Sequence, residues 1–139
     1  MYENYTRQAL PSKQYRELLG SAICVFNSNN QFIIENILRI NNNEFNWHDL
    51  IDKTSGQLST PIQKTITEKS DEEISDLFTQ LTIKRNRIVH SFQITFEDEQ
   101  ILSTKDRQHN QFHITIEYLL QFIKENEVLC DKLYKLRGF

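Results

Sequence analysis

Residues 70–96 have the sequence SDEEISDLFTQLTIKRNRIVHSFQITF, in which a helical pattern changes to a strand pattern at His90. Ser70 and Glu73 have the spacing of a capping box, so we expect a helix to begin at Ser70. The apolar residues of this helix recur at spacings of three, four and seven, which indicates one buried side: Ile74, Leu77, Phe78, Leu81 and Ile88. Beyond His90, apolar and polar residues alternate over 92–96, as is typical of a strand.

Arg85 falls on the same stripe as these apolar residues. A guanidinium is rarely removed from water unless carboxylates, phosphates or carbonyls replace its hydrogen bonds, because the loss is costly. Arg85 therefore has either a partner inside the protein or an anionic ligand. Lys84, Arg87 and His90 add basic groups within the same seven residues, in a chain whose formal net charge is −3. We expect a phosphate-sized anion to find donors here.

The spacing of these residues limits which of them can act together. Asn86 and His90 are four residues apart and share one face of the helix. Arg85 and His90 are five residues apart, and five steps of about 100° leave their side chains about 140° apart. Both can reach one ligand only if the helix loosens near His90, if Arg85 extends around it, or if a second chain completes the site.

Arg85, the polar Asn86 directly after it and His90 five residues after Arg85 resemble the Arg, polar, three-residue, His signature of the HEPN superfamily (higher eukaryotes and prokaryotes nucleotide-binding domains). HEPN domains are small helical bundles, often dimeric, and many are metal-independent endoribonucleases of toxin and antiviral systems. The chain resembles them closely only around this motif. In HEPN toxins silenced by a nucleotidyltransferase partner, a modifiable Tyr stands two positions after the His; here that position is Phe92, which has no hydroxyl.

The resemblance implies that His90 transfers the proton, that Arg85 stabilises the phosphorane and that Asn86 orients the phosphate or His90. Such a pair is chemically sufficient, because RNA carries its own nucleophile, the 2′-hydroxyl, and histidine can act as acid or base near neutral pH. Lys84 and Arg87 are then expected to hold flanking phosphates. The alternative is a non-catalytic HEPN-like dimeric module whose basic helix end binds a nucleotide or a protein partner.

The expected partners are RNA, a second copy of the chain and an antitoxin or regulatory protein. We expect a symmetric homodimer because Asn86 and His90 share a face that Arg85 does not, and one helix end makes a poor cleft for an RNA backbone. No apolar run is long enough for a membrane span. His109 and His113 have a spacing seen in metal sites, but no Cys or carboxylate cluster completes a ligand set, so we expect no metal and no cofactor.

Composition bounds the class of protein. With 139 residues, 38% hydrophobic and 25% charged, the chain is expected to form one domain over 1–139. The pI near 5.8 excludes a protein that coats nucleic acid through its overall charge. Cys24 and Cys130 lie in apolar helical patterns and are expected to be reduced core thiols of a cytoplasmic protein.

The remaining segments predict a mainly α fold: a HEPN-like helical bundle of about four to five helices with a small β-hairpin after the central helix. Residues 12–40 keep helical spacing across a polar turn at 27–31, which favours one long helix, with a break as the alternative. Another long helix is predicted from Thr115 to a stop at Gly138.

Shorter elements are predicted between the long helices. Asn46 can cap a short helix over 47–54, with Trp47 as a core anchor. Residues 101–104 can return along 92–96 to complete the hairpin.

Overall fold

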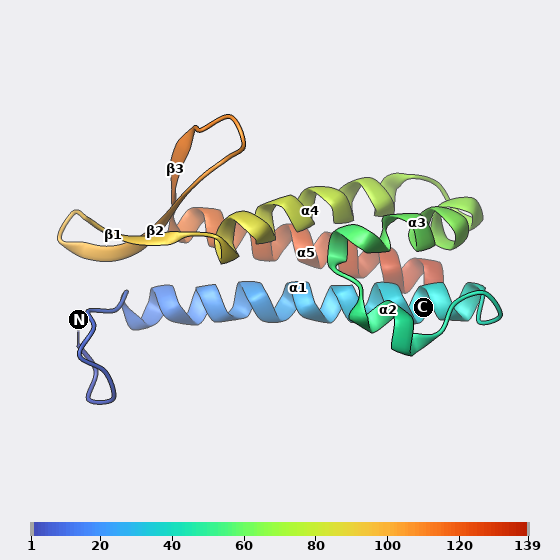
Figure 1. Ribbon diagram of the computed structural model, residues 1–139, viewed down its shortest axis with the longest axis horizontal. Coiled ribbons are helices and arrows are strands. Elements are labelled where there is room, and N and C mark those ends of the chain that lie inside the picture. Colours follow the sequence, from blue (N-terminus) through green and yellow to red (C-terminus); the bar gives the residue numbers. More distant parts are fainter. Residues whose placement is uncertain (1, 139) are drawn as a thin grey trace.

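Helices make up most of the structure, and the predicted mainly α class is confirmed. The computed structural model describes residues 2–138, which also form a small three-stranded antiparallel sheet (Figure 1). The elements in chain order are α1 (Lys13–Ile40), α2 (Trp47–Asp52), the 3₁₀ turn η1 (Ser55–Leu58), α3 (Ser59–Ile62), the π-helical turn η2 (Gln63–Thr67), α4 (Glu73–Val89), β1 (Phe92–Phe96), β2 (Glu99–Lys105), β3 (Gln111–Ile114) and α5 (Ile116–Arg137).

The first helix, α1, is continuous over 28 residues, as predicted. Its polar segment does not break the helix, because part of that segment is used for packing. Asn29 is buried, and its amide nitrogen donates to the backbone carbonyl of Asn126 at 2.8 Å and to the side-chain oxygen of Asn126 at 3.1 Å. A buried amide that finds partners costs little, so these two residues fix how α1 lies against α5.

The three long helices lie side by side, with α4 running opposite to α1 and α5 (Figure 1). Phe26 of α1 lies at their common contact, with ring centroids 5.7 Å from Phe78 of α4 and 6.3 Å from Phe122 of α5. All three rings are buried in one hydrophobic cluster that the short helices extend through Leu50, Leu58, Ile62 and Ile66. The apolar stripe of residues 70–96 therefore faces this cluster, as its period predicts.

The sheet confirms the predicted hairpin and adds a strand that was not predicted. β1 and β2 pair antiparallel, with Phe92 opposite Ser103. Their two-residue turn places Glu97 and Asp98 at positive φ, as a tight hairpin requires. β3 pairs with the other edge of β2, in a segment for which the sequence analysis predicted no strand.

Tyr15 of α1 holds the sheet at its end of the bundle. Its buried hydroxyl donates to the carbonyl of Ile114 on β3 and accepts the N–H of Leu102 on β2 at 3.0 Å. Burial raises the pKa of Tyr15 above its ordinary value, so the hydroxyl stays protonated and both hydrogen bonds persist at neutral pH.

The start of α4 differs from the prediction. α4 begins at Glu73, and Ser70 does not cap it, because the Ser70 hydroxyl donates to the carbonyl of Ile66 at 2.8 Å. The carboxylate of Asp71 instead accepts the N–H of Glu73 at 2.9 Å. The preceding π-helical turn has already engaged Ser70, which local spacing cannot reveal.

Two predicted core residues are wrong. Trp47 is 45% exposed at the start of α2. Within residues 2–138, the one aromatic ring packed against it is that of its neighbour His48, with ring centroids 5.5 Å apart. Cys24 is exposed on α1, and Cys130 is partly buried. Thr115 and Gly138, by contrast, cap α5 at its two ends as predicted, with Gly138 at φ 103°.

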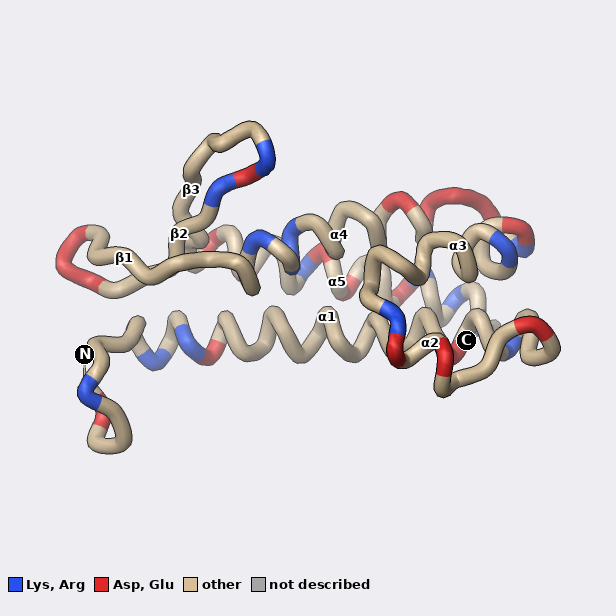
Figure 2. The backbone as a smooth tube through the Cα atoms, viewed as in Figure 1, with Lys and Arg blue, Asp and Glu red and all other residues tan. Residues whose placement is uncertain are grey.

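Charges separate along α4, with acidic residues at its start and basic residues near its end (Figure 2). The β2–β3 loop also carries basic residues, and it lies beside the basic end of α4. Within residues 2–138, no helix has the length and apolar character needed to cross a membrane. Over the same range, no group of three or more His, Cys, Asp or Glu side chains could hold a metal ion.

Candidate functional site

The last turn of α4 places His90 at a sharp change of direction. The backbone N–H of His90 donates to the carbonyl of Asn86 at 2.8 Å, and its φ of −95° and ψ of 56° end the helix. On the other side, the carbonyl of His90 accepts from the hydroxyl of Thr104 on β2 at 3.2 Å. The His90 backbone is therefore held by both α4 and the sheet, while its side chain is exposed to solvent.

Arg85 is half-buried against an aromatic ring. Its guanidinium carbon lies 4.7 Å from the centroid of Phe26, and its Nε donates to Oδ1 of Asn86 at 3.0 Å. Burial lowers the pKa of Arg85 from its ordinary value, although the group remains charged at neutral pH. Among residues 2–138, no carboxylate forms an ion pair with it. The ring attracts the cation without neutralising it, so Arg85 keeps charge for an anion.

Lys84 has different surroundings, although it directly precedes Arg85 in the chain. Its ammonium group lies 2.6 Å and 3.0 Å from the two carboxylate oxygens of Glu125 on α5. Both side chains of this ion pair are partly buried. Lys84 is thus largely neutralised by a partner inside the protein, and its part in RNA binding remains a prediction.

Arg87 faces a pocket between the end of α4, the β2–β3 loop and the start of α5. One guanidinium N–H of Arg87 donates to the backbone carbonyl of Lys105 at the end of β2. The pocket has a volume of about 450 Å³. Its lining combines basic, amide and aromatic side chains: Ile83, Lys84, Asn86, Arg87, Asp106, Arg107, Gln108, Phe112 and Tyr118.

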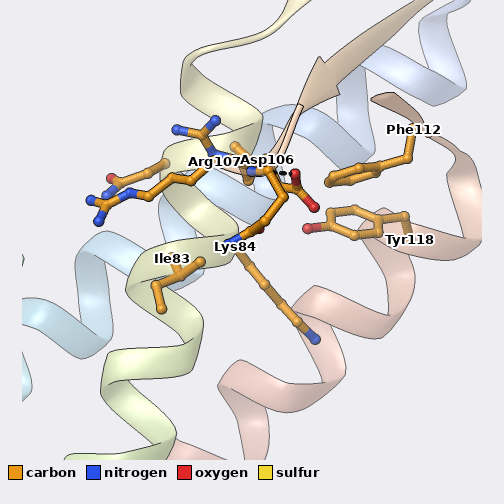
Figure 3. Close-up of a pocket in the computed structure, with 9 residues that line it drawn as sticks. Ile83, Lys84, Asp106, Arg107, Phe112 and Tyr118 are labelled. Atoms are coloured by element: carbon orange, nitrogen blue, oxygen red, sulfur yellow. Dashed lines mark hydrogen bonds between the residues drawn. The ribbon is translucent and has the colours of Figure 1, made fainter. Parts of the chain in front are cut away.

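Two aromatic rings form one side of this pocket. Phe112 of β3 and Tyr118 of α5 lie side by side with centroids 5.7 Å apart and ring planes at 44°, whereas the Lys84 side chain extends away from them toward α5 (Figure 3). Burial raises the pKa of Tyr118; the nearby Glu125 raises it further, and Arg87 acts in the opposite direction. The Tyr118 hydroxyl is therefore protonated at neutral pH and can donate a hydrogen bond.

The acidic residue of the pocket is held by its own loop. The carboxylate of Asp106 accepts the backbone N–H of Asn110 at 3.0 Å and that of Gln108 at 2.9 Å. These hydrogen bonds, the one from Asn110 above all, keep the pKa of Asp106 below its ordinary value. Asp106 is thus ionised at neutral pH and shapes the loop that closes the pocket.

The structure brings together only part of the predicted site. Arg85 touches Asn86, and Asn86 lines the pocket that also contains Arg87. Neither Arg85 nor His90 lines that pocket, and no contact between their side chains is found among the described residues. This separation agrees with the angle expected on a regular helix.

Five pocket residues outside α4 were missed by the sequence reasoning: Asp106, Arg107, Gln108, Phe112 and Tyr118. The only signal in the sequence was the alternation of polar and apolar residues over Gln111–Ile114, which is too short to separate a strand from a loop.

Comparison with known proteins gives no relative for this chain: no protein-family model matches it, and no curated protein or solved structure shows significant similarity to it.

Proposed function

We propose that the protein is a metal-independent endoribonuclease of HEPN type, with a HEPN-like bundle, acting in the cytoplasm in toxin or antiviral defence. One observation carries this proposal: Arg85 is half-buried over Phe26 and has no carboxylate partner among residues 2–138. A guanidinium that is partly buried and keeps its positive charge is suited to bind an anionic ligand. It stands five residues before an exposed histidine whose backbone is fixed at the end of α4.

The proposed reaction uses the RNA's own nucleophile. His90 accepts the proton of the 2′-hydroxyl as that oxygen attacks phosphorus, or returns a proton to the leaving 5′-oxygen. Arg85 stabilises the negative charge that develops on the phosphorane. Asn86 accepts a hydrogen bond from Arg85 at 3.0 Å, which supports a role in orienting the guanidinium. The products are a 2′,3′-cyclic phosphate, or its hydrolysed form, and a 5′-hydroxyl.

The flanking cations contribute unequally in this proposal. Arg87 lines the pocket beside α4 and can contact a neighbouring phosphate directly. Lys84 is paired with Glu125, so it adds little beyond a weak long-range field. Activity should therefore fall with added salt, but less steeply than if Lys84, Arg85 and Arg87 were three free cations.

The active unit is proposed to be a symmetric homodimer. Two apolar side chains beside His90 are exposed, Val89 at 54% and Phe92 at 46%. Burying them against a second copy would offset the repulsion between two basic helix ends and would bring two His90 and two Arg85 side chains to one groove. Light scattering at micromolar concentration should give a dimer, and Val89→Asp should give an inactive monomer. A fully active wild-type monomer would exclude this arrangement.

The direct test is RNA cleavage without metal. Purified protein is incubated with total RNA in EDTA, and wild type is compared with His90→Ala and with His48→Ala, a matched control because His48 is also exposed but lies on α2. Cleavage should be lost in His90→Ala, by about 10²- to 10⁴-fold, and kept in the control. DNA of the same sequence should stay intact because it lacks the 2′-hydroxyl. Products with 3′-hydroxyl and 5′-phosphate ends would rule out this chemistry.

A second candidate is a non-catalytic HEPN-like dimeric module that binds a nucleotide or a regulatory protein. The Lys84 ion pair favours it, because Glu125 neutralises one of the cations that would otherwise hold RNA. The same assay separates the two candidates. Intact RNA with every variant, together with a stable dimer, would favour the module.

A further inference from the structure

The pocket beside α4 contains Asn86 of the predicted catalytic motif but neither Arg85 nor His90, and its lining combines aromatic rings with guanidinium groups. Resting on the proposed ribonuclease function, we infer that this pocket binds one nucleotide of the RNA strand next to the cleaved bond. The base lies against the rings of Phe112 and Tyr118. The phosphate of the same nucleotide is held by the guanidinium groups of Arg87 and Arg107.

The rings supply a surface for a base. Phe112 and Tyr118 both line the pocket and both remain partly exposed, so apolar ring surface faces the open space (Figure 3). Unpaired RNA bases stack on aromatic side chains in this way, and the interaction tolerates different bases because each has a π-face. A volume of about 450 Å³ is within the range of small-ligand sites and accommodates a nucleotide.

The charges favour an anion. Lys84, Arg87 and Arg107 bring three positive charges to the lining, of which Glu125 pairs with that of Lys84, and Asp106 brings one negative charge. The Asp106 carboxylate is already occupied by the backbone N–H groups of Gln108 and Asn110. Arg107 is exposed and forms no ion pair within residues 2–138. Its planar guanidinium can therefore bind a phosphate through two parallel hydrogen bonds.

The hydroxyl of Tyr118 adds a polar contact. Its pKa is raised, so it is a donor at neutral pH, and it has no hydrogen-bond partner among the described residues. A phosphate oxygen or a ribose hydroxyl of the bound nucleotide can accept from it. Together with the two guanidinium groups, this donor makes the pocket more suitable for a sugar phosphate than for an apolar ligand.

Asn86 connects the pocket to the catalytic residues. Its side chain lines the pocket, and its Oδ1 accepts from Nε of Arg85. A nucleotide in the pocket therefore lies next to the residue that positions Arg85. An RNA strand that continues from the pocket over the end of α4 presents its next phosphate to Arg85 and His90. The pocket would thus select single-stranded RNA, whose bases are free to leave the stack.

The test measures binding separately from cleavage. The ligand is a fluorescein-labelled single-stranded 2′-O-methyl octaribonucleotide, which lacks a free 2′-hydroxyl and so stays intact. Fluorescence anisotropy gives its Kd for the chain of 139 residues. Phe112→Leu and Arg107→Ala should each raise Kd by about tenfold, from lost stacking and a lost phosphate contact. The matched controls are Phe96→Leu on β1 and Arg39→Ala on α1, which lie outside the pocket. They should change Kd by less than about twofold.

A second measurement identifies the base. Octamers with one abasic nucleotide at each position in turn are bound to wild type and to Phe112→Leu. One abasic position should weaken binding by wild type by about tenfold and leave binding by Phe112→Leu unchanged, because the ring that the base contacts is already absent. Binding of free AMP tests the alternative that the pocket takes a free nucleotide. If AMP binds as tightly as the octamer and Arg107→Ala weakens it, the pocket takes a free nucleotide and the inference about RNA is overturned.

The two proposals fail in different ways. If Phe112→Leu and Arg107→Ala bind the octamer as the controls do, the pocket inference is overturned, even when His90→Ala abolishes cleavage. If both variants weaken binding but wild type cuts no RNA, the ribonuclease proposal fails; the pocket is then a nucleotide-binding site for RNA, and its placement next to a cleaved bond is overturned. Should Phe112→Leu fold poorly, Arg107→Ala decides the result, because Arg107 is an exposed loop residue.

Discussion

Two adjacent cations of α4 have opposite kinds of partner: Lys84 lies on the side that faces α5, and Arg85 lies on the side that faces α1. Lys84 meets a carboxylate, with 2.6 Å between its nitrogen and an oxygen of Glu125. Arg85 meets a ring, with its guanidinium carbon 4.7 Å from the centroid of Phe26. A carboxylate neutralises the cation and ties two helices together, whereas a ring supports the cation and leaves its charge. The local density of Lys and Arg therefore does not tell which cation is available to a ligand.

The largest difference between Arg85 and Lys84 is expected in the rate of RNA cleavage. Arg85→Ala should lower kcat/KM for RNA cleavage by about 10²- to 10³-fold, because it removes a donor to the transition state. Lys84→Ala should lower it by less than about tenfold, because its charge is already neutralised by Glu125. Initial rates on a fluorogenic oligoribonucleotide in EDTA measure both. Equal losses in the two variants would show that the ion pair opens when RNA binds.

Folding of these variants is the control. Arg85→Ala and His90→Ala should both stay within about 1 kcal/mol of wild type in urea unfolding, because Arg85 loses a cation–π contact and one partly exposed hydrogen bond to Asn86, and His90 is exposed. An insoluble Arg85→Ala protein would identify Arg85 as a structural residue instead.

The next largest effect concerns the ring beneath Arg85. Phe26→Leu keeps an apolar side chain but removes the stacking on Phe78 and Phe122 as well as the contact with Arg85, so we expect a loss of about 1–3 kcal/mol. Cleavage should fall too, because Arg85 loses its support. Phe122→Leu is the matched control, since it removes one stacked ring without touching Arg85. If both variants lose stability but cleave RNA equally well, the ring under Arg85 has no part in catalysis.

A smaller effect is expected for the ion pair. A double-mutant cycle of Lys84→Ala and Glu125→Ala should give a coupling free energy of about 0.5–1 kcal/mol, the range for partly exposed pairs. Chemical unfolding of the four proteins measures it. A coupling near zero would mean that the contact contributes nothing to holding α4 on α5.

The smallest effect is the salt dependence of these couplings. Raising the ionic strength from about 0.05 M to about 0.5 M should reduce the coupling of Lys84 and Glu125, because salt screens partly exposed charges. The matching cycle for Arg85→Ala and Phe26→Leu should change less, because a cation over a ring is held at short range and partly away from water. The same loss of coupling in both cycles would contradict the distinction between the two sides of α4.

Local sequence determined the long elements of this protein. The apolar period of α4, the helical spacing of α1 and the caps of α5 at Thr115 and Gly138 all follow from residues within a few positions of one another. The alternation of apolar and polar residues in β1 predicted a strand for the same reason. The angle between Arg85 and His90 also follows from helix geometry alone.

Tertiary structure decided what those elements touch. Nothing near Lys84 in the chain indicates that Glu125, 41 positions away, neutralises it, and nothing near Arg85 indicates that it lies over Phe26. β3 exists because β2 offers it an edge, and only this strand brings Phe112 beside Tyr118. Helix period and caps depend on neighbours in sequence, whereas partners of buried charges and the lining of a pocket depend on neighbours in space.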